Sequence, residues 1–429
     1  MKNLGHVIKL ERIKRNMKQI TLAKGICTPS YLSKIENNSI APSQEVVNLL
    51  LARLELTISQ DKNIDDDSYL EYIRNIYFEA IMHKDRKLTL EKLEEILAEQ
   101  YLFNDVSNYY TYQLMVFRLS LIVYDLKREE GDLVPSLTEM SSNFDDYQSF
   151  LFHANIGIYH SLKIDYAASL ESLEQANEFF QKVTIDKWEE ADFYFLMAHS
   201  YYVHQRWVIA VEYIQKSLEF FKNGFYNNRV VECYLILSAA QNKSHKTEEA
   251  VENLILAKRI ATQLNLSEHL HTITHNLGTF SSTKEEHDKA ISYFKESLEM
   301  RTENSQRMNP IFSLIKEYSK LGQSQEVVQW ACQGLDLVQS AHDDSLTNFY
   351  HHFSVYKSRN SGFENFEKIT ISAIQFFKEI KDYRYAQKYS LFLAEYFKAD
   401  TKYKNAAKYY ALSSEYMFKK QKVNFWEDL

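Results

Sequence analysis

The chain has 429 residues, 45% hydrophobic and 25% charged, which is typical of a soluble folded protein with room for two or three domains. It contains 4 Pro and 9 Gly but 30 Tyr and 26 Phe, which predicts a nearly all-helical protein and excludes a disordered chain. The net charge is −8, yet residues 1–60 carry 9 Lys/Arg and 4 Asp/Glu, a net of +5 that leaves −13 for the remainder. Because phosphate contacts need cations, any nucleic-acid surface is expected within the first 60 residues.

Cysteine usage and hydropathy indicate where the protein works. Cys27, Cys233 and Cys332 lie far apart and form no metal-type pair, which favours free thiols in a reducing compartment. The sequence shows no signal-peptide pattern and no apolar run long enough to span a bilayer. We therefore expect a cytoplasmic protein with no membrane partner.

The first 60 residues have the pattern of a small helical domain. An apolar stripe with basic flanks predicts a first helix from Leu4 to about Arg15, and a second helix is expected from Gln19 to about Lys24. Gly25 supplies a turn, Thr28 is a good N-cap, and Pro29 suits the first position of a third helix that ends near Asn37. Ser43 caps a fourth helix, whose apolar residues are Val46, Val47, Leu49, Leu50 and Leu54.

The third helix has the side chains that entry into a DNA groove requires. Leu32 and Ile35 face inward, and small hydroxyl groups at the start of the helix can bond to base edges, while a lysine suits a phosphate. The string SYLSKIENN, with Gln19 and Leu22-Ala23, resembles the Cro/repressor (XRE) type of helix-turn-helix. By that resemblance Gln19 meets a phosphate and the third helix reads bases of double-stranded DNA; the candidate DNA-binding residues are Gln19, Thr28, Ser30, Tyr31, Ser33, Lys34 and Asn37. The alternative is a small bundle with an ordinary polar face.

After a polar linker expected at residues 61–68, residues 69–429 repeat with a period near 40 residues. Ala210, Ala250, Ala290, Val327 and Ala406 occupy equivalent places. A small residue on one helix is followed twelve positions later by a second small residue and, after four more, by a large one. The three series are Gly157, Ala198, Ser238, Gly278, Ala394; Ser169, Ala210, Ala250, Ala290, Ala406; and Leu173, Ile214, Leu254, Phe294, Tyr410. This pattern resembles tetratricopeptide repeats and predicts about nine helix pairs that form a right-handed superhelix.

The first helices of such pairs line a concave groove, which in tetratricopeptide repeats holds extended peptides. Asn155 in ANIG and Asn276 in HNLG share one repeat position, where an amide can grip a peptide backbone. The candidate peptide-binding residues are Asn155, His199, Tyr202, Asn242, Asn276, Lys316, Lys320 and Arg359, the last three being candidates for holding a carboxylate. The alternative for each is a solvated polar position on a helix.

No pattern in the chain demands catalysis. His271 and His275 are spaced i, i+4, but no carboxylate or cysteine completes a metal set, and no phosphate-binding loop or nucleophile motif occurs. We expect no metal, no cofactor and no enzymatic activity.

A Cro-type head followed by a tetratricopeptide-like array resembles the peptide-responsive regulators of Gram-positive bacteria, the Rgg, Rap, NprR, PlcR and PrgX group. The resemblance implies a quorum-sensing transcriptional regulator that acts as a homodimer on DNA and binds a short signalling peptide. Two alternatives stay open at this point. One is a Rap-like protein that binds a response regulator or removes its phosphate; the other is a scaffold that binds a partner protein and no free peptide.

Overall fold

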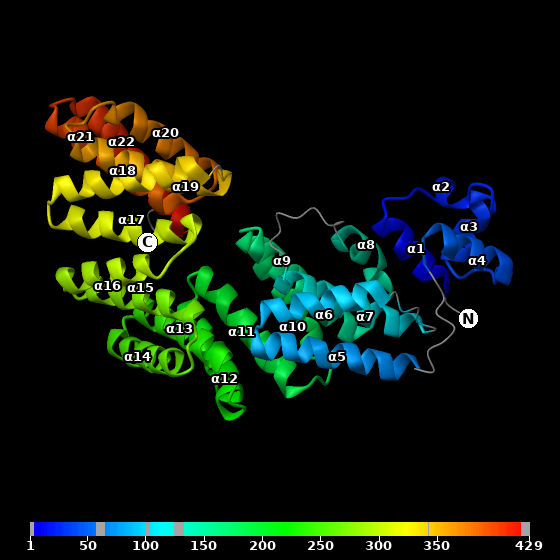
Figure 1. Cartoon of the computed structure of the whole chain (residues 1–429). Helices are drawn as coiled ribbons and strands as arrows, with labels where there is room; N and C mark the ends of the chain where they lie inside the picture. Colours follow the sequence, from blue (N-terminus) through cyan, green and yellow to red (C-terminus); the bar gives the residue numbers. More distant parts are fainter. Residues whose placement is uncertain are drawn as a thin grey trace. The chain divides into compact units, whose positions relative to one another are not determined.

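The computed structural model describes residues 4–56, 65–99, 101, 103, 105–123, 133–341 and 343–421. These residues form 22 α-helices and two short 3₁₀ helices, with no strand among them, which confirms the all-α prediction (Figure 1). None of the described helices is long and apolar enough to cross a bilayer. The elements are α1 (Leu4–Lys14), α2 (Gln19–Ala23), α3 (Pro29–Glu36), α4 (Gln44–Arg53), α5 (Asp66–His83), α6 (Arg86–Glu99), α7 (Val106–Val123), α8 (Leu133–Met140), η1 (Ser141–Asn143), α9 (Asp146–Leu162), α10 (Tyr166–Phe180), α11 (Lys187–Val203), α12 (Trp207–Asn223), α13 (Asn227–Lys243), α14 (Thr247–Gln263), α15 (Ser267–Thr283), α16 (His287–Glu299), α17 (Asn304–Lys320), α18 (Ser324–Ala341), η2 (Asp344–Leu346), α19 (Thr347–Asn360), α20 (Phe366–Glu379), α21 (Tyr383–Ala399) and α22 (Tyr403–Gln421).

Helices α1–α4, here called the head, form at the places that the sequence predicts. The Thr28 hydroxyl accepts the Tyr31 amide at the start of α3, and the Ser43 hydroxyl does the same for Val46 at the start of α4. Gly25 has a φ of +74°, a backbone conformation that glycine adopts without steric cost and that turns the chain between α2 and α3.

The core of the head is formed by apolar residues of all four helices. Leu32, Ile35, Val47, Leu50 and Leu54 are buried together with residues of α1 and α2. Leu49, in contrast, is 46% exposed. It belongs to α4 as the sequence predicts, but it lies one position outside the buried apolar stripe of that helix.

The predicted linker, residues 61–68, falls partly outside the described residues. Residues 61–64 are among those not described, whereas Asp65 is the N-cap of α5 and accepts the Ser68 amide through its side chain. The domain limits at residues 60 and 69 stay a prediction.

Helices α5–α22 number eighteen, as about nine helix pairs require, and α9–α10, α11–α12, α15–α16, α17–α18, α19–α20 and α21–α22 pack directly as pairs, which confirms the repeat architecture (Figure 1). The short helix α8 packs against α1 instead. The chain divides into two compact units, Met1–Asn253 and Leu254–Leu429. Within each unit the small residue of the first helix packs against the large residue sixteen positions later. A Cβ atom added to Gly157 would lie 2.6 Å from Leu173 Cγ, and one added to Gly278 would lie 2.7 Å from Phe294 Cε1. The small residue of the first helix therefore makes the room that the large residue of the second helix fills.

The turns inside successive pairs share a feature that the sequence does not reveal. Most of these turns have one residue with a left-handed backbone, and these residues are Lys84, Ile164, Gln205, His245, Glu285, Gly322 and Thr401; the α19–α20 turn has three, Gly362, Phe363 and Asn365. Only two of these ten residues are glycine, so most of the turns carry no glycine signal.

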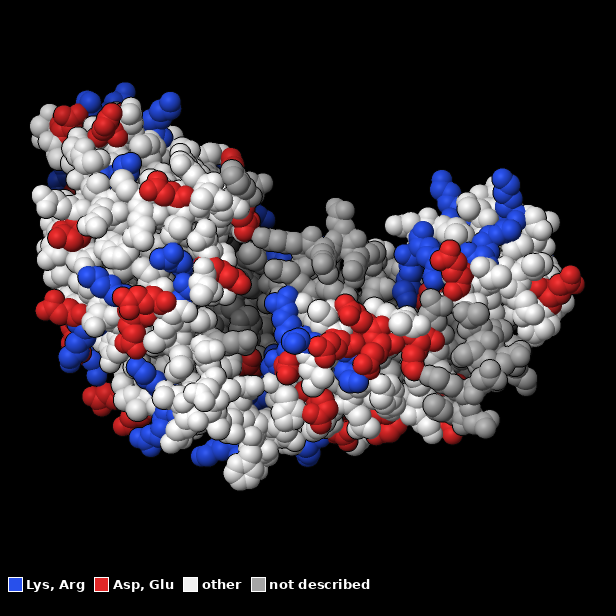
Figure 2. All heavy atoms as spheres, in the orientation of Figure 1, with Lys and Arg blue, Asp and Glu red and all other residues white. Residues whose placement is uncertain are grey.

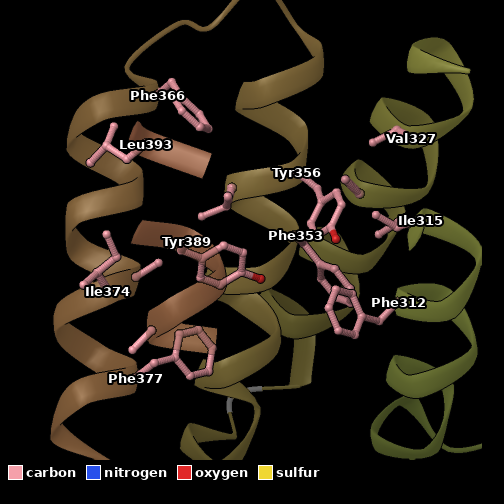
Figure 3. Packing of buried hydrophobic residues seen from close by; sticks show 14 of the residues in the cluster. Phe312, Ile315, Val327, Phe353, Tyr356, Phe366, Ile374, Phe377, Tyr389 and Leu393 are labelled. Carbon is pink, nitrogen blue, oxygen red and sulfur yellow. The ribbon is translucent and has the colours of Figure 1, made fainter. Parts of the chain in front are cut away.

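The second unit has a large aromatic core (Figure 3). Phe312 and Ile315 of α17 pack with Phe353 and Tyr356 of α19, and Tyr389 of α21 belongs to the same cluster. The first helices of three successive pairs are thereby fixed against one another.

Candidate DNA-binding head and repeat sites

The candidate DNA-binding residues of α3 form one outward face of the head. Thr28, Ser30, Lys34 and Asn37 are exposed, and Ser33 is half-buried among them. Hydroxyl, amide and ammonium groups on one short helix can reach base edges and phosphates together.

Tyr31 is half-buried and packs against the core of the head. Its ring has a structural role in addition to the base contact predicted for it.

A buried carboxylate holds this face in place. Glu36, at the end of α3, is 1% exposed and accepts two hydrogen bonds from the Arg12 guanidinium, at 2.6 and 2.9 Å. The Gln19 amide donates to Glu36 Oε2 at 2.7 Å. One carboxylate therefore joins α1, α2 and α3, and Gln19, predicted to meet a phosphate, is oriented by it at the start of α2. The phosphate contact itself stays a prediction.

Lysine and arginine side chains gather on the edge of the head that carries α2 and α3 (Figure 2). This agrees with the net charge of +5 over residues 1–60. A cationic edge beside an exposed polar helix is the electrostatic pattern of a DNA-binding surface.

Within the first unit, the head contacts the repeats through α1 and α7. The Tyr109 hydroxyl donates to Glu11 Oε1 at 2.6 Å, and Lys14 Nζ donates to Gln113 Oε1 at 3.2 Å. Burial opposes ionisation of Glu11, but the charge of Lys14 and the hydrogen bonds that it accepts lower its pKa overall. His6 and the Tyr110 hydroxyl lie 3.0 Å apart in the same contact.

All eight candidate peptide-binding residues lie on the first helices of their pairs, α9 to α19. Asn155 of α9 is 1% exposed, and its Nδ2 donates to the Leu114 carbonyl of α7 at 2.8 Å. The amide thus braces two first helices, so its nitrogen is engaged in a structural bond; a contact between Asn155 and a peptide stays a prediction.

Three other candidates belong to the first unit. His199 and Tyr202 of α11 are half-buried, and burial together with the charge of Lys84 lowers the pKa of His199. Asn242, in the last turn of α13, accepts the Thr247 hydroxyl at 3.2 Å.

The remaining four candidates belong to the second unit. Asn276 of α15 is half-buried, and no hydrogen bond to its side chain occurs among the described residues. Lys320 is exposed and donates to Glu317 and to the Ser282 hydroxyl, both at 2.7 Å. Lys316 Nζ lies 4.9 Å from the centre of the Phe312 ring, and Arg359 Cζ lies 3.9 Å from that of Phe392.

Four charged residues with prominent contacts in the structure were not predicted from the sequence. Arg118 and Arg229 are buried and both bind Asp192 at 2.7 Å, which ties α7, α11 and α13 together. Lys388 lies on α21 beside Arg359. A positional signal did exist, because Asp192 and Lys388 each precede a small repeat residue (Ala198 and Ala394) by six positions.

In the part of the chain that the structure describes, no group of three or more His, Cys, Asp or Glu side chains is arranged to hold a metal ion.

Comparison with known proteins gives matches to the head and to most of the chain. Residues 8–60 match the Helix-turn-helix family. The transcriptional activator NprA of Geobacillus stearothermophilus is 32% identical over 387 residues, which cover 87% of this chain and 93% of that protein. Two solved structures share the fold. A Rap protein complexed with competence and sporulation factor is 20% identical with a TM-score of 0.68, and the match covers 82% of this chain and 99% of that one. NprR in complex with its cognate peptide NprX is 17% identical with a TM-score of 0.63, over 82% of this chain and 99% of that one.

Proposed function

This chain belongs to the family of the transcriptional activator NprA, and we propose that it regulates transcription by binding double-stranded DNA through its head, under the control of a short peptide bound by the repeats. The observation that carries the proposal is the exposed polar face of α3, which Glu36 and Arg12 fix beside a cationic edge. The residues proposed to contact DNA are those of the candidate face, with Ser33 and Lys34 at its centre.

Peptide binding is proposed from the repeats themselves. Polar and cationic side chains recur on the first helices of successive pairs, and NprR, which shares the fold, has been solved with a peptide. Peptide binding would favour one arrangement of the first helices and thereby change the freedom of the head, which is a shift between populated states.

We propose that the chain acts as a homodimer, because helix-turn-helix heads read two half-sites separated by about one DNA turn. We further propose that it is not an enzyme and that it works in the cytoplasm.

The test is a selection from random double-stranded DNA with the full chain, in the presence and absence of peptides extracted from culture. We expect enrichment of a two-fold symmetric site and a change of affinity when peptide is added. Replacing Ser33 by Ala and Lys34 by Met should weaken DNA binding about tenfold or more without changing peptide binding. Lys378→Met, an exposed lysine on α20, is the matched control and should change neither. Failure to enrich any sequence would refute the proposal.

A second candidate function is a Rap-like protein-binding regulator, because the fold is shared with a Rap protein. A phosphate-release assay with phosphorylated response regulators separates the two. Release stimulated by this chain would favour the Rap-like function and contradict the non-enzymatic assignment.

A further inference from the structure

A cavity lies between the head and the repeats, within the first unit. It has a volume of about 290 Å³, at the lower end of the range for small-molecule sites. Its lining comes from α1 of the head and from α6, α7 and the residues next to them. The apolar and aromatic part of the lining comprises Val7, Leu56, Leu97, Tyr101, Tyr109 and Tyr112. Walls of this kind favour a ligand with a hydrophobic body.

Two neighbouring residues of α7 bring unpaired hydrogen-bond donors to this cavity. Tyr112 is 6% exposed, and its hydroxyl forms no hydrogen bond with any described residue. Gln113 is 3% exposed, and its Oε1 accepts Lys14 Nζ at 3.2 Å, which orients the amide and leaves Nε2 without an acceptor in the described part of the chain. Buried donors without a partner are rare, because leaving one unpaired is unfavourable. A ligand with an acceptor atom would satisfy both.

The charged groups of the cavity favour an uncharged ligand. Lys14 Nζ donates to Glu11 Oε1 at 2.9 Å and Arg15 donates to Glu11 Oε2, so both cations of the lining are engaged by one carboxylate. Burial, together with the charges of Glu11 and Glu99, raises the pKa of Tyr112. The hydroxyl therefore keeps the proton that it can donate, and the same two carboxylates oppose an anion beside it.

We infer that this cavity binds a small uncharged aromatic molecule with a carbonyl oxygen, which accepts hydrogen bonds from Tyr112 and Gln113. The ring of the ligand packs against the tyrosine rings of the wall. Because the lining belongs to both the head and the repeats, the bound molecule stabilises the contact between α1 and α7. The cavity shares no residue with the candidate DNA-binding face or with the candidate peptide-binding residues, so the inference does not depend on the proposed function.

The test measures the binding of benzamide and acetanilide to the full chain by ligand-observed NMR. Both probes are uncharged rings that carry a carbonyl oxygen, and benzoate and benzylamine serve as charged counterparts of benzamide. We expect at least one uncharged probe to bind with a Kd of about 1 mM or lower, and the charged probes to bind at least about threefold more weakly. The bound probe should also slow hydrogen exchange of the α1 amides.

Two variants connect the binding to the cavity. Tyr112→Phe removes only the hydroxyl, so it should weaken binding about fivefold or more while unfolding at the temperature of the parent or above it. Leu97→Trp enlarges a side chain of the wall that is 45% exposed and should exclude the probe. The matched controls, Tyr403→Phe and Leu88→Trp, change exposed residues outside the lining and should bind as the parent does.

The site is refuted if neither uncharged probe binds, or if Tyr112→Phe or Leu97→Trp keeps the full affinity of the parent. Tighter binding of benzoate or benzylamine than of benzamide would contradict the uncharged class of ligand. If Leu97→Trp does not fold, Tyr112→Phe decides alone. None of these outcomes bears on DNA binding by the head.

Discussion

Glu36 shows how much of the head depends on one side chain. It is buried at the end of α3 and accepts hydrogen bonds from Arg12 and Gln19, so its removal leaves the largely buried Arg12 guanidinium without its carboxylate partner. We predict that Glu36→Ala destabilises the head by about 3 kcal/mol. Hydrogen exchange of the α1–α3 amides measures the effect. Glu45→Ala, which removes an exposed acid from α4, should leave exchange nearly unchanged, and equal exchange in the two variants would contradict the role of Glu36.

The role of Glu36 also could not be predicted from the sequence, whereas the inward-facing residues of the same helix could. Hydrophobic spacing predicts which leucines and isoleucines of α3 face inward, because helix geometry fixes that periodicity. A buried ion pair such as that of Glu36 with Arg12 joins residues 24 positions apart, and each of its members alone has the appearance of a surface charge. Asp192, which pairs with the distant residues Arg118 and Arg229, was missed for the same reason.

Ile164 is a second residue whose backbone conformation lowers the stability of the fold by a measurable amount. It is β-branched, 67% exposed and has a φ of +63°, where a branched side chain is strained and asparagine is tolerated. We predict that Ile164→Asn stabilises the α9–α10 pair by about 1 kcal/mol. Slower amide exchange in these two helices would confirm the strain. Leu162→Asn, two residues earlier on α9, should bring no gain, and a similar gain there would show that strain is not the cause.

At the scale of elements, helix pairing was the most predictable feature of the chain. A small residue and the large one sixteen positions later meet because each lies on a fixed face of its helix, so the spacing in sequence becomes a contact in space. The turns between the helices were not predictable, since Gln205, His245 and Glu285 adopt left-handed backbones without the usual residue preference.

The contact between Gly278 and Phe294 tests this packing. A methyl group at position 278 would lie 2.7 Å from the Phe294 ring, so the two helices must separate or the ring must move. We predict that Gly278→Ala destabilises the second unit by about 1–3 kcal/mol, measured by thermal unfolding. Thr279→Ala, at an exposed neighbouring position, is the control.

The first unit suggests a compensating change. There Ala198 and Ile214 occupy the equivalent repeat positions and both are fully buried. Adding Phe294→Ile to Gly278→Ala should therefore recover part of the lost stability. If the two changes are additive in a double-mutant cycle, the direct contact between these positions is not the cause of the loss.

At the scale of the whole molecule, the repeats can influence the head only through contacts between them. Within the first unit α7 is a repeat helix that contacts both α9 and the head helix α1. Its Leu114 carbonyl accepts the Asn155 amide, while its Gln113 and Tyr109 side chains contact α1. Neighbouring residues of one helix thus bind a candidate peptide residue on one side and the head on the other. A change at Asn155 is expected to shift α7 and, with it, the freedom of the head.

This arrangement predicts different effects for substitutions of Asn155 and Asn276, the two asparagines that share a repeat position. We predict that Asn155→Ala increases hydrogen exchange in α1 and changes DNA affinity even without peptide, because it removes a buried hydrogen bond that positions α7. Asn276→Ala, in the second unit and without such a bond among the described residues, should weaken peptide binding and leave the peptide-free affinity for DNA unchanged. Both variants can be compared in one DNA titration with and without peptide. Should Asn155→Ala behave as Asn276→Ala does, α7 would not connect the repeats to the head, and Asn155 would be a peptide contact alone.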